Sequence, residues 1–396
     1  MKISVRFSFE QLAYFVQGPL TWLEKLVALR HPQRIGPLDP VVSPATPSHD
    51  DRYAVVNALA DSELACELLA SAIPEARAGK WRLLSFQISK IRRHHRKRIV
   101  TGLMSYQTGE NTVIQTAEII VKVYGSDRGS KALETLKQLW QAGFCSPARH
   151  QVPRPYGYLP QEGALLQATA PGTSWANLVQ TEDPSLATGS ERAAAWLLQL
   201  QRSRLAGEPR DRAGAVESVQ RWSQELAATF PGHAYQLESV AGRLVPALQS
   251  DGIPLAPSHG DYHPMNVFLT PTLTTVIDFD TFALREAAFD VGYAIGQLLI
   301  MSYFQTGAFD PGAKAAHAFW HHYQTGGQAL WNRVAAQIAR TFLQSLHYEL
   351  YTLHNNRLEL LSLWTTLMDA WLDSGRTTIL DGLRALPLQV QEVSVR

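Results

Sequence analysis

The spacing of apolar residues changes along the chain, and its first section is helical in character. Segments around Phe9–Leu29 and Tyr53–Leu69 carry apolar residues at helical spacing. A Pro- and Ser-rich stretch, Pro37 to Pro47, lies between them and is typical of a linker. Residues 1–80 are therefore predicted to form a helical N-terminal extension, to which the pattern assigns no role.

From residue 81 to residue 170 the pattern favours strands. The β-branched runs Ile99–Val100, Thr112–Ile114 and Ile119–Tyr124, with turn residues at 107–111, predict consecutive antiparallel strands. A helix is predicted from about Ser130 to Ala142, followed by a strand pair that resumes at 164–167. Residues 81–170 are thus predicted to form a strand-rich lobe with one helix.

Residues 171–396 are mostly helical by the same criterion. The expected helices are 190–202, 215–229, 235–248 and three more after Phe289, ending in a long helical section. Two short strands, Val267–Leu269 and Thr275–Ile277, are expected among them. A strand-rich lobe followed by a helical one predicts a bilobal α+β fold, with the space between the lobes as a common place for a ligand.

Composition narrows the class of protein. The 396 residues are 45% apolar and 18% charged, with a formal net charge of +1, which excludes a disordered or fibrous chain and gives no reason to expect nucleic acid or a membrane as partner. The run Val291–Phe304 is too short to span a bilayer and predicts a buried helix. Two cysteines in no CxxC pair, and no leader-like start, predict a cytoplasmic protein with reduced thiols.

Charge is spread unevenly. Residues 251–396 hold 8 Lys/Arg and 13 Asp/Glu, a balance of −5 (8 − 13), which leaves +6 for the first 250 residues. Eight Lys/Arg stand between Lys80 and Arg98 without an acid. This segment is either a solvated basic hairpin or a surface that faces phosphates.

The loop Ser258–Asn266, with the sequence SHGDYHPMN, carries the most specific chemistry. Asp261 and Asn266 lie five residues apart, and Asp278 follows in IDFD at the end of a predicted strand. Phosphoryl transfer needs magnesium on the phosphates and a carboxylate near the attacking hydroxyl. Asn266 and Asp278 can supply oxygen ligands for magnesium, which leaves Asp261 to accept or orient the hydroxyl proton.

The string HGDxHPxN, followed by a strand and IDFD, resembles the catalytic and metal loops of the aminoglycoside phosphotransferases, choline kinases and their relatives. The resemblance covers roughly residues 85–380 in layout and implies a protein-kinase-like fold, with ATP and Mg²⁺ as cofactors. It implies that Asp261 is the catalytic base and that Asn266 and Asp278 are the magnesium ligands. His259 and His263 are then supporting residues of the loop, and Asp290, in FDVG, braces the loop from the next helix.

Two other interpretations of this motif stay open. His259 and His263 can be surface turn residues, with Asp278 a cap at a strand end. Alternatively, His259, Asp261 and His263, spaced two residues apart, can bind a metal, which would require further His or carboxylate ligands. The metal-site interpretation does not explain why Asn266 and Asp278 occur together.

The strand-rich lobe should contribute a lysine for the nucleotide phosphates. Lys122, in IIVKVY on a strand that precedes a helix, fits the kinase pattern VAIK. Its usual partner is a helix glutamate, but Glu134 lies off the apolar stripe of its helix, and a surface position is an equal alternative. Glu134 and Asp280, the second acid of IDFD, complete the set of candidates.

The expected nucleotide contacts are partly of main-chain type. Ala168, Thr169 and Ala170 precede Pro171-Gly172 and resemble the family's hinge, where the base meets the backbone. The Gly-rich loop of protein kinases is missing, and RRHHRKR (92–98) stands in its place, which allows contact with nucleotide phosphates or with an anionic substrate through charge. No P-loop motif occurs in the chain.

The predicted function is transfer of a γ-phosphate from ATP to a hydroxyl of a small molecule, such as an amino sugar, a sugar or an amino alcohol. Aromatic and acidic residues after position 300, among them Trp320, Tyr348 and Asp369, are the candidates for substrate contact. One alternative is a pseudokinase-like nucleotide-binding module, which the missing glycines favour and the intact Asp261, Asn266 and Asp278 oppose. A Ser/Thr kinase acting on polypeptides is disfavoured, because no APE segment follows. The sequence leaves the oligomeric state open.

Overall fold

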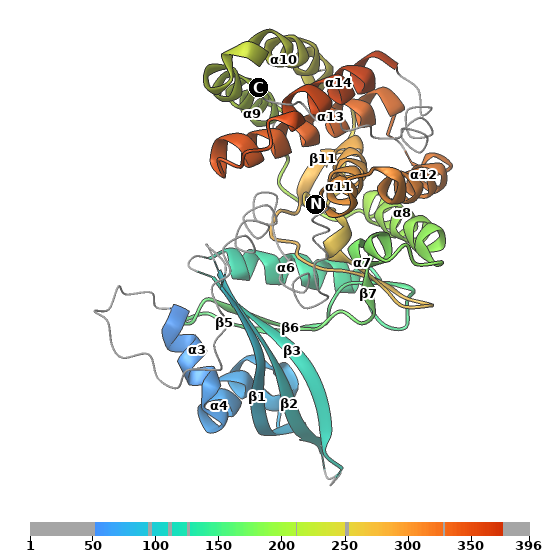
Figure 1. Ribbon diagram of the computed structural model, residues 1–396. Helices are drawn as coiled ribbons and strands as arrows, with labels where there is room; N and C mark the ends of the chain where they lie inside the picture. The colour runs from blue at the N-terminus through green and yellow to red at the C-terminus, as the bar shows by residue number, and fades with distance from the viewer. Residues whose placement is uncertain are drawn as a thin grey trace, which may run out of the picture. The chain divides into compact units, whose positions relative to one another are not determined.

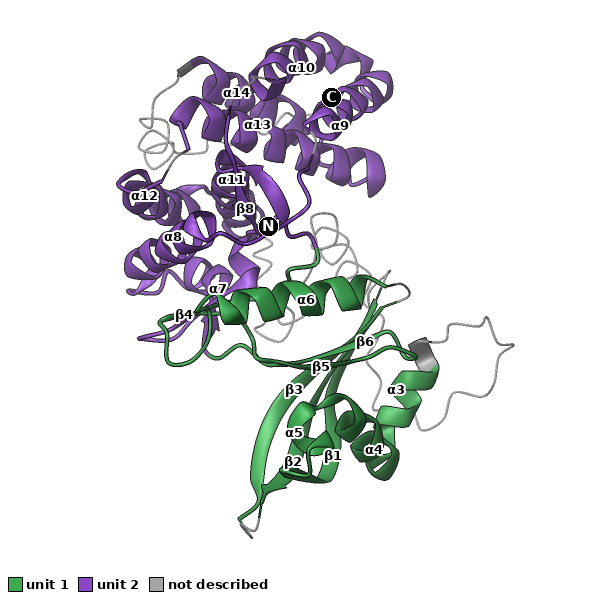
Figure 2. Cartoon of the chain, turned by 180° about the vertical axis from the view of Figure 1, so that it is seen from behind, with its two compact units in different colours: residues 1–14, 29–171, 275–280 green, residues 15–28, 172–274, 281–396 purple. Residues whose placement is uncertain are grey.

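The computed structural model describes residues 52–374, except 94–96, 110–112, 125–126, 211, 250–252 and 328. The described residues form two compact units, which are treated separately below. One comprises residues 52–171 and 275–280, and the other residues 172–274 and 281–374 (Figure 2). The predicted helix at Phe9–Leu29 and the linker at Pro37–Pro47 lie outside the described residues.

An antiparallel five-stranded sheet forms the centre of the first unit (Figure 1). Its order is β1-β2-β3-β6-β5, and its strands are β1 (Trp81–Arg93), β2 (Lys97–Thr108), β3 (Gln115–Tyr124), β5 (Pro155–Leu159) and β6 (Ala164–Ala168), with β4 (His150–Gln151) outside it. The prediction of a strand at Thr112–Ile114 was wrong. Val113 and Ile114 are 62% and 58% exposed in the connection to β3, because pairing with β2 begins only at Gln115, opposite Tyr106.

Helices complete the first unit. The predicted helix at Tyr53–Leu69 is two helices, α3 (Arg52–Ala60) and α4 (Ser62–Ala72), followed by α5 (Pro74–Arg77). The break falls at Asp61, whose carboxylate accepts hydrogen bonds from the Glu63 and Leu64 amides and so caps α4. Apolar residues of α3 and α4 share a buried core with β1–β3, β5 and β6. Helix α6 (Arg128–Gln141) matches the predicted helix and buries one apolar stripe.

The second unit is mainly helical, as predicted. Its helices are α7 (Trp175–Gln180), α8 (Leu186–Arg202), α9 (Ala213–Thr229), α10 (Ala234–Gln249), α11 (Ala288–Thr306), α12 (Asp310–Gln324), α13 (Trp331–His347) and α14 (Glu359–Ser374), with shorter turns η1 (Pro231–His233), η2 (Pro264–Asn266) and η3 (Tyr348–Thr352). Phe289 lies in the first turn of α11, and in the described range three further α-helices, α12, α13 and α14, begin after it. The predicted buried helix at Val291–Phe304 is the central part of α11, which is almost fully buried. Of the helices that the structure describes, none combines the length and apolar composition needed to cross a membrane.

Short strands support the site loop. β8 (Leu255–Ser258) and β11 (Ala283–Glu286) pair antiparallel, with Ser258 opposite Ala283, and the sequence pattern did not predict this pair. The predicted strand Val267–Leu269 is β9, which pairs with β7 (Thr173–Ser174). The other predicted strand is β10 (Thr274–Val276). The loop from His259 to His263 thus runs between two strands, β8 and β9, that fix its ends.

Candidate active site

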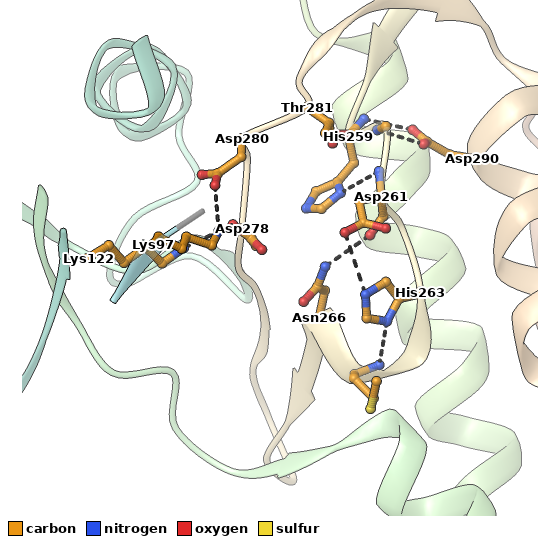
Figure 3. A network of polar contacts seen from close by, with 12 residues as sticks. Lys97, Lys122, His259, Asp261, His263, Asn266, Asp278, Asp280, Thr281 and Asp290 are labelled. Atoms are coloured by element: carbon orange, nitrogen blue, oxygen red, sulfur yellow. Dashed lines mark hydrogen bonds and ion pairs between the residues drawn. The ribbon is translucent and has the colours of Figure 1, made fainter. Parts of the chain in front are cut away.

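The loop that follows β8 is held by a carboxylate from α11 (Figure 3). Asp290, with no exposed surface, accepts hydrogen bonds from the backbone amides of His259 (2.7 Å) and Gly260 (2.9 Å). Gly260 has φ +79°, and a Cβ there would lie 2.4 Å from the Thr281 carbonyl oxygen. Only glycine suits this turn, because a side chain would meet both backbone strain and a fixed backbone atom.

Asp261 is at the centre of this loop and is 1% exposed. Its Oδ2 lies 3.6 Å from His263 Nε2. Burial alone would raise the pKa of Asp261, but His263, His259 and the hydroxyl of Tyr293 outweigh burial, so that the pKa is lowered. The carboxylate is therefore ionised at neutral pH and can accept a hydrogen bond from a hydroxyl group.

Two histidines shape the loop, each through a hydrogen bond from the backbone amide two residues further on to its ring. His259 Nδ1 accepts from the Asp261 amide, and His263 Nδ1 accepts from the Met265 amide, each at 3.2 Å. In a neutral ring whose Nδ1 is an acceptor, Nε2 carries the proton. His263 therefore presents an N–H group toward the Asp261 carboxylate. Among the described residues, no group of three or more His, Cys, Asp or Glu could hold a metal ion, which disfavours a His259–Asp261–His263 metal site.

Asn266, in η2, is fully buried and has two distinct ends. Its Nδ2 donates to the Asp261 carbonyl oxygen at 3.0 Å. This bond fixes the orientation of the amide, because a flipped amide would place two oxygens against each other. The Oδ1 atom is buried and finds no hydrogen-bond partner among the described residues. A buried amide oxygen that accepts no hydrogen bond from the described residues is suited to bind a cation.

The other group of candidate residues lies in the first unit (Figure 3). Lys122 Nζ is 3.0 Å from Asp278 Oδ1. Lys97 Nζ lies 3.4 Å from the same oxygen and 2.5 Å from Asp280 Oδ2. Tyr124 donates its hydroxyl to Asp280 Oδ1 at 2.8 Å. Two lysines thus pair with two carboxylates in a cluster that is largely buried.

Strand register explains how this cluster forms. Lys97 pairs with Tyr124, and Ile99 pairs with Lys122, across β2 and β3. Because side chains alternate along strands, Lys97, Lys122 and Tyr124 share one face of the sheet. Asp278 follows β10 with φ +71°, a backbone conformation that is uncommon outside glycine and is often found at functional sites.

Lys97 is a member of this cluster that the sequence analysis did not single out. Burial lowers the pKa of Lys97, but Asp278 and Asp280 raise it more, so the net pKa is raised and the ammonium stays charged. The signal that could have identified Lys97 was its register opposite Tyr124, given Lys122. The basic segment 80–98 therefore has at least one residue that faces inward and binds two acids.

Replacing Lys97 with Met is expected to destabilise the protein by about 3 kcal/mol, because Asp280 would lose its lysine partner and Asp278 would lose one of its two lysines. The matched control is Lys137→Met. Lys137 pairs with Glu134 at 2.9 Å on the exposed surface of α6, where an ion pair contributes roughly 0.5 kcal/mol or less. Urea unfolding of both variants measures the difference. Equal destabilisation in the two would show that the Lys97 contacts add nothing to folding.

The remaining candidates lie away from this cluster. Glu134 is exposed and its recorded partner is Lys137, whereas the partner of Lys122 is Asp278. Ala168, at the end of β6, donates its amide to the Arg154 carbonyl oxygen. Thr169 and Ala170 follow β6 and are partly exposed.

Several solved structures are similar to this chain. A choline/ethanolamine kinase family protein from Mesorhizobium loti is similar over 82% of this chain and 99% of its own, with 15% identity and a TM-score of 0.50. A glucosamine kinase in complex with glucosamine, ADP and inorganic phosphate is similar over 78% of this chain and 84% of its own, with 21% identity and a TM-score of 0.49. A spectinomycin phosphotransferase in complex with ADP and spectinomycin covers 82% and 99%, with 10% identity and a TM-score of 0.48. The first likeness confirms the predicted protein-kinase-like fold.

Sequence comparison then identifies the family. No curated protein matches the chain. The model of the phosphotransferase enzyme family matches residues 108–336, which is more than half of the chain. The matched range contains the loop of Asp261 and Asn266 as well as Asp278. The chain therefore belongs to the phosphotransferase enzyme family.

Proposed function

We propose that this phosphotransferase moves the γ-phosphoryl group of ATP to a hydroxyl of a small molecule, with magnesium, in the cytoplasm. One observation carries the proposal. A single loop presents the ionised carboxylate of Asp261 and the buried Oδ1 of Asn266, which has no hydrogen-bond partner among the described residues. A proton acceptor and a cation ligand are the two groups that phosphoryl transfer requires from such a loop.

Asp261 receives the proton in the proposed reaction. The acceptor oxygen forms a bond to the γ-phosphorus, and the bond from that phosphorus to the β–γ bridging oxygen breaks. The hydroxyl proton passes to the Asp261 carboxylate, and ADP leaves with the electron pair of the broken bond. The loop contributes mainly by placing these groups, because phosphoryl transfer needs little covalent work from the protein.

Asn266 and Asp278 fit a magnesium ion by their chemistry. Magnesium takes oxygen ligands and keeps several of its waters, so one carboxylate and one amide oxygen suffice alongside substrate phosphates. Asn266 Oδ1 is held without a hydrogen-bond partner in the described part of the chain, and Asp278 offers a carboxylate that pairs with two lysines. When bound, magnesium neutralises charge on the nucleotide phosphates and orients them.

Lys122 and Lys97 are proposed to bind nucleotide phosphates. Both are buried, at 2% and 5% exposure, and both carry their charge next to Asp278. Two lysines on neighbouring strands can supply by charge what a Gly-rich loop supplies through backbone amides. The backbone of Ala168, Thr169 and Ala170 is proposed to meet the nucleotide base.

Nucleotide binding and ADP release test this function together. ATP with magnesium should raise the thermal midpoint of the protein more than ATP alone, because a ligand of the folded state stabilises it by mass action. ADP release should then depend on a hydroxylated small molecule. Absence of both the thermal shift at millimolar ATP and ADP release would overturn the proposal and favour a binding module without turnover.

A further inference from the structure

A cavity of about 540 Å³ lies within the second unit, next to the Asp261 loop. Gly260, Thr281 and Tyr293 are part of its wall. The volume falls in the range of about 300–1,000 Å³ that is usual for sites of small molecules. The cavity is therefore the candidate place for the phosphoryl acceptor, because Gly260 in its wall directly precedes the proposed base in the chain.

Its walls are unusually rich in arginine. Five arginines line the cavity, from the segment before α9, from α9 itself, from β11 and from α13: Arg210, Arg212, Arg221, Arg285 and Arg340. Among the described residues of the wall, the one acid is Glu286. Its two oxygens are already bound, by Arg333 at 2.5 and 3.1 Å and by Gln337 at 2.6 Å. The wall thus has a large positive charge that Glu286 does not offset.

We propose that the acceptor is a hydroxylated small molecule that carries an oxyanion group, a phosphate or a carboxylate, which these arginines bind. The inference rests on the proposed function and adds the class of its substrate. Guanidinium groups match phosphate and carboxylate in planar, two-point hydrogen bonding. An anionic tail held by the arginines would leave the acceptor's hydroxyl end to the Asp261 loop.

Two of the arginines are held in fixed positions. The Arg340 guanidinium lies 5.3 Å from the ring centre of Phe289 and 5.5 Å from that of Trp222. Arg285 lies 4.8 Å from the same phenylalanine ring and donates to the Thr281 carbonyl oxygen at 3.0 Å. Stacking on aromatic rings occupies the faces of a guanidinium and leaves its edge for an anion. The Nε of Arg340 is buried and finds no hydrogen-bond partner in the described part of the chain.

The positive charges of the arginines in the wall repel one another. The pKa of Arg340 is lowered to about 10, mainly by burial; the nearby charge of Arg285 also lowers it, while Tyr293 and Glu286 raise it. Burial also lowers the pKa of Arg285, with a further contribution from Arg210 and opposition from Asp290 and Asp261. Both groups stay protonated at neutral pH, so the repulsion persists until an anion relieves it.

The same cavity argues against a cationic acceptor. The net charge of −5 for residues 251–396 is compatible with a cationic acceptor, for which the acids after position 300 were the candidate contacts. Two of these acids, Asp369 and Asp373, instead pair with Arg243 outside the cavity. Trp320 and Tyr348, predicted as substrate contacts, are also absent from the described wall. Aminoglycosides and choline would face the wrong charge in this space.

Binding and turnover with matched acceptors test the inference. Calorimetry of the full-length protein compares glycerol, glycerol 3-phosphate, glycerate and choline, and the pair glucose and glucose 6-phosphate. We expect the anionic members to bind and the neutral and cationic ones to bind at least about tenfold more weakly. The phosphate and carboxylate compounds together show which oxyanion is preferred.

Variants separate cavity binding from general charge. Arg340→Gln should weaken binding of the preferred anion about tenfold or more. Arg221→Gln should act in the same direction and, since Arg221 is exposed at the surface of α9, without harm to folding. Arg243→Gln, outside the cavity, is the matched control and should leave binding unchanged.

The possible outcomes separate this inference from the proposed function. Turnover of neutral or cationic acceptors, with no preference for anions, would overturn the anionic class and leave the phosphotransferase function standing. Anion binding that is lost in both cavity variants, without ATP-dependent turnover of any acceptor, would support an anionic ligand for the cavity. The same result would contradict the proposed function. Anion binding that the cavity variants leave unchanged would overturn the inference.

Discussion

Replacement of Asp261 with Asn is expected to lower kcat at least about a hundredfold, because a positioned proton acceptor contributes about 10²- to 10⁴-fold. The amide has the same shape but cannot take the hydroxyl proton. The loop itself should survive, since two bonds that shape it at this position use the backbone: the Asp261 carbonyl accepts from Asn266, and its amide donates to His259. ATP binding with magnesium should therefore persist in a thermal-shift titration, while ADP release stops.

The matched control for this prediction is Asp310→Asn. Asp310 lies in the first turn of α12 and pairs with Lys314 at 2.6 Å on the surface. It should keep turnover, since surface pairs contribute little. Turnover of the Asp261→Asn variant at the level of the control would remove Asp261 from the mechanism.

The site loop could be predicted from the sequence because its contacts are short in sequence. His259 to Asp261, His263 to Met265 and Asn266 to Asp261 are bonds over two to five residues. A local string of residues can encode such geometry completely. Asp290 is 30 residues from Gly260, and it was singled out because FDVG resembles the pattern of the family.

Residues that meet across long stretches of chain escaped prediction. Lys97 binds Asp278 and Asp280, which are 181 and 183 residues further on. It lies within a run of basic residues, and nothing in that run indicates that the Lys97 side chain faces inward. The five arginines that line the cavity come from positions 210 to 340, and no periodic pattern in the sequence connects them. Such groups depend on how the helices pack.

Element prediction failed for related reasons. β-Branched residues at Val113 and Ile114 favour strands by propensity, yet they are exposed in a connection, because partner strands decide where a ladder begins. The pair β8–β11 was missed since Leu255–Ser258 includes a proline and is only four residues long. Its partner strand lies 25 residues further on, so the pairing leaves no local pattern.

Replacement of Asp278 with Asn is expected to remove the magnesium-dependent part of ATP binding and to lower turnover at least about a hundredfold. Asparagine tolerates the left-handed backbone at this position, φ +71°, so the change removes a charge without straining the chain. Lys97 would then keep Asp280 as its partner, and the surplus positive charge of Lys97 and Lys122 would still attract nucleotide phosphates. Magnesium, which requires the carboxylate oxygen, should lose its effect.

The measurement is the difference between the thermal shift by ATP with magnesium and that by ATP with a chelator. At a free ATP concentration of 100 Kd, binding stabilises the wild type by about 2.7 kcal/mol, and the variant should show equal shifts under both conditions. Asp127→Asn is the control, because Asp127 is exposed at the start of α6 and should keep the full magnesium effect. An Asp278→Asn variant that responds to magnesium as this control does would exclude Asp278 as a ligand and leave Asn266 without its proposed partner on the ion.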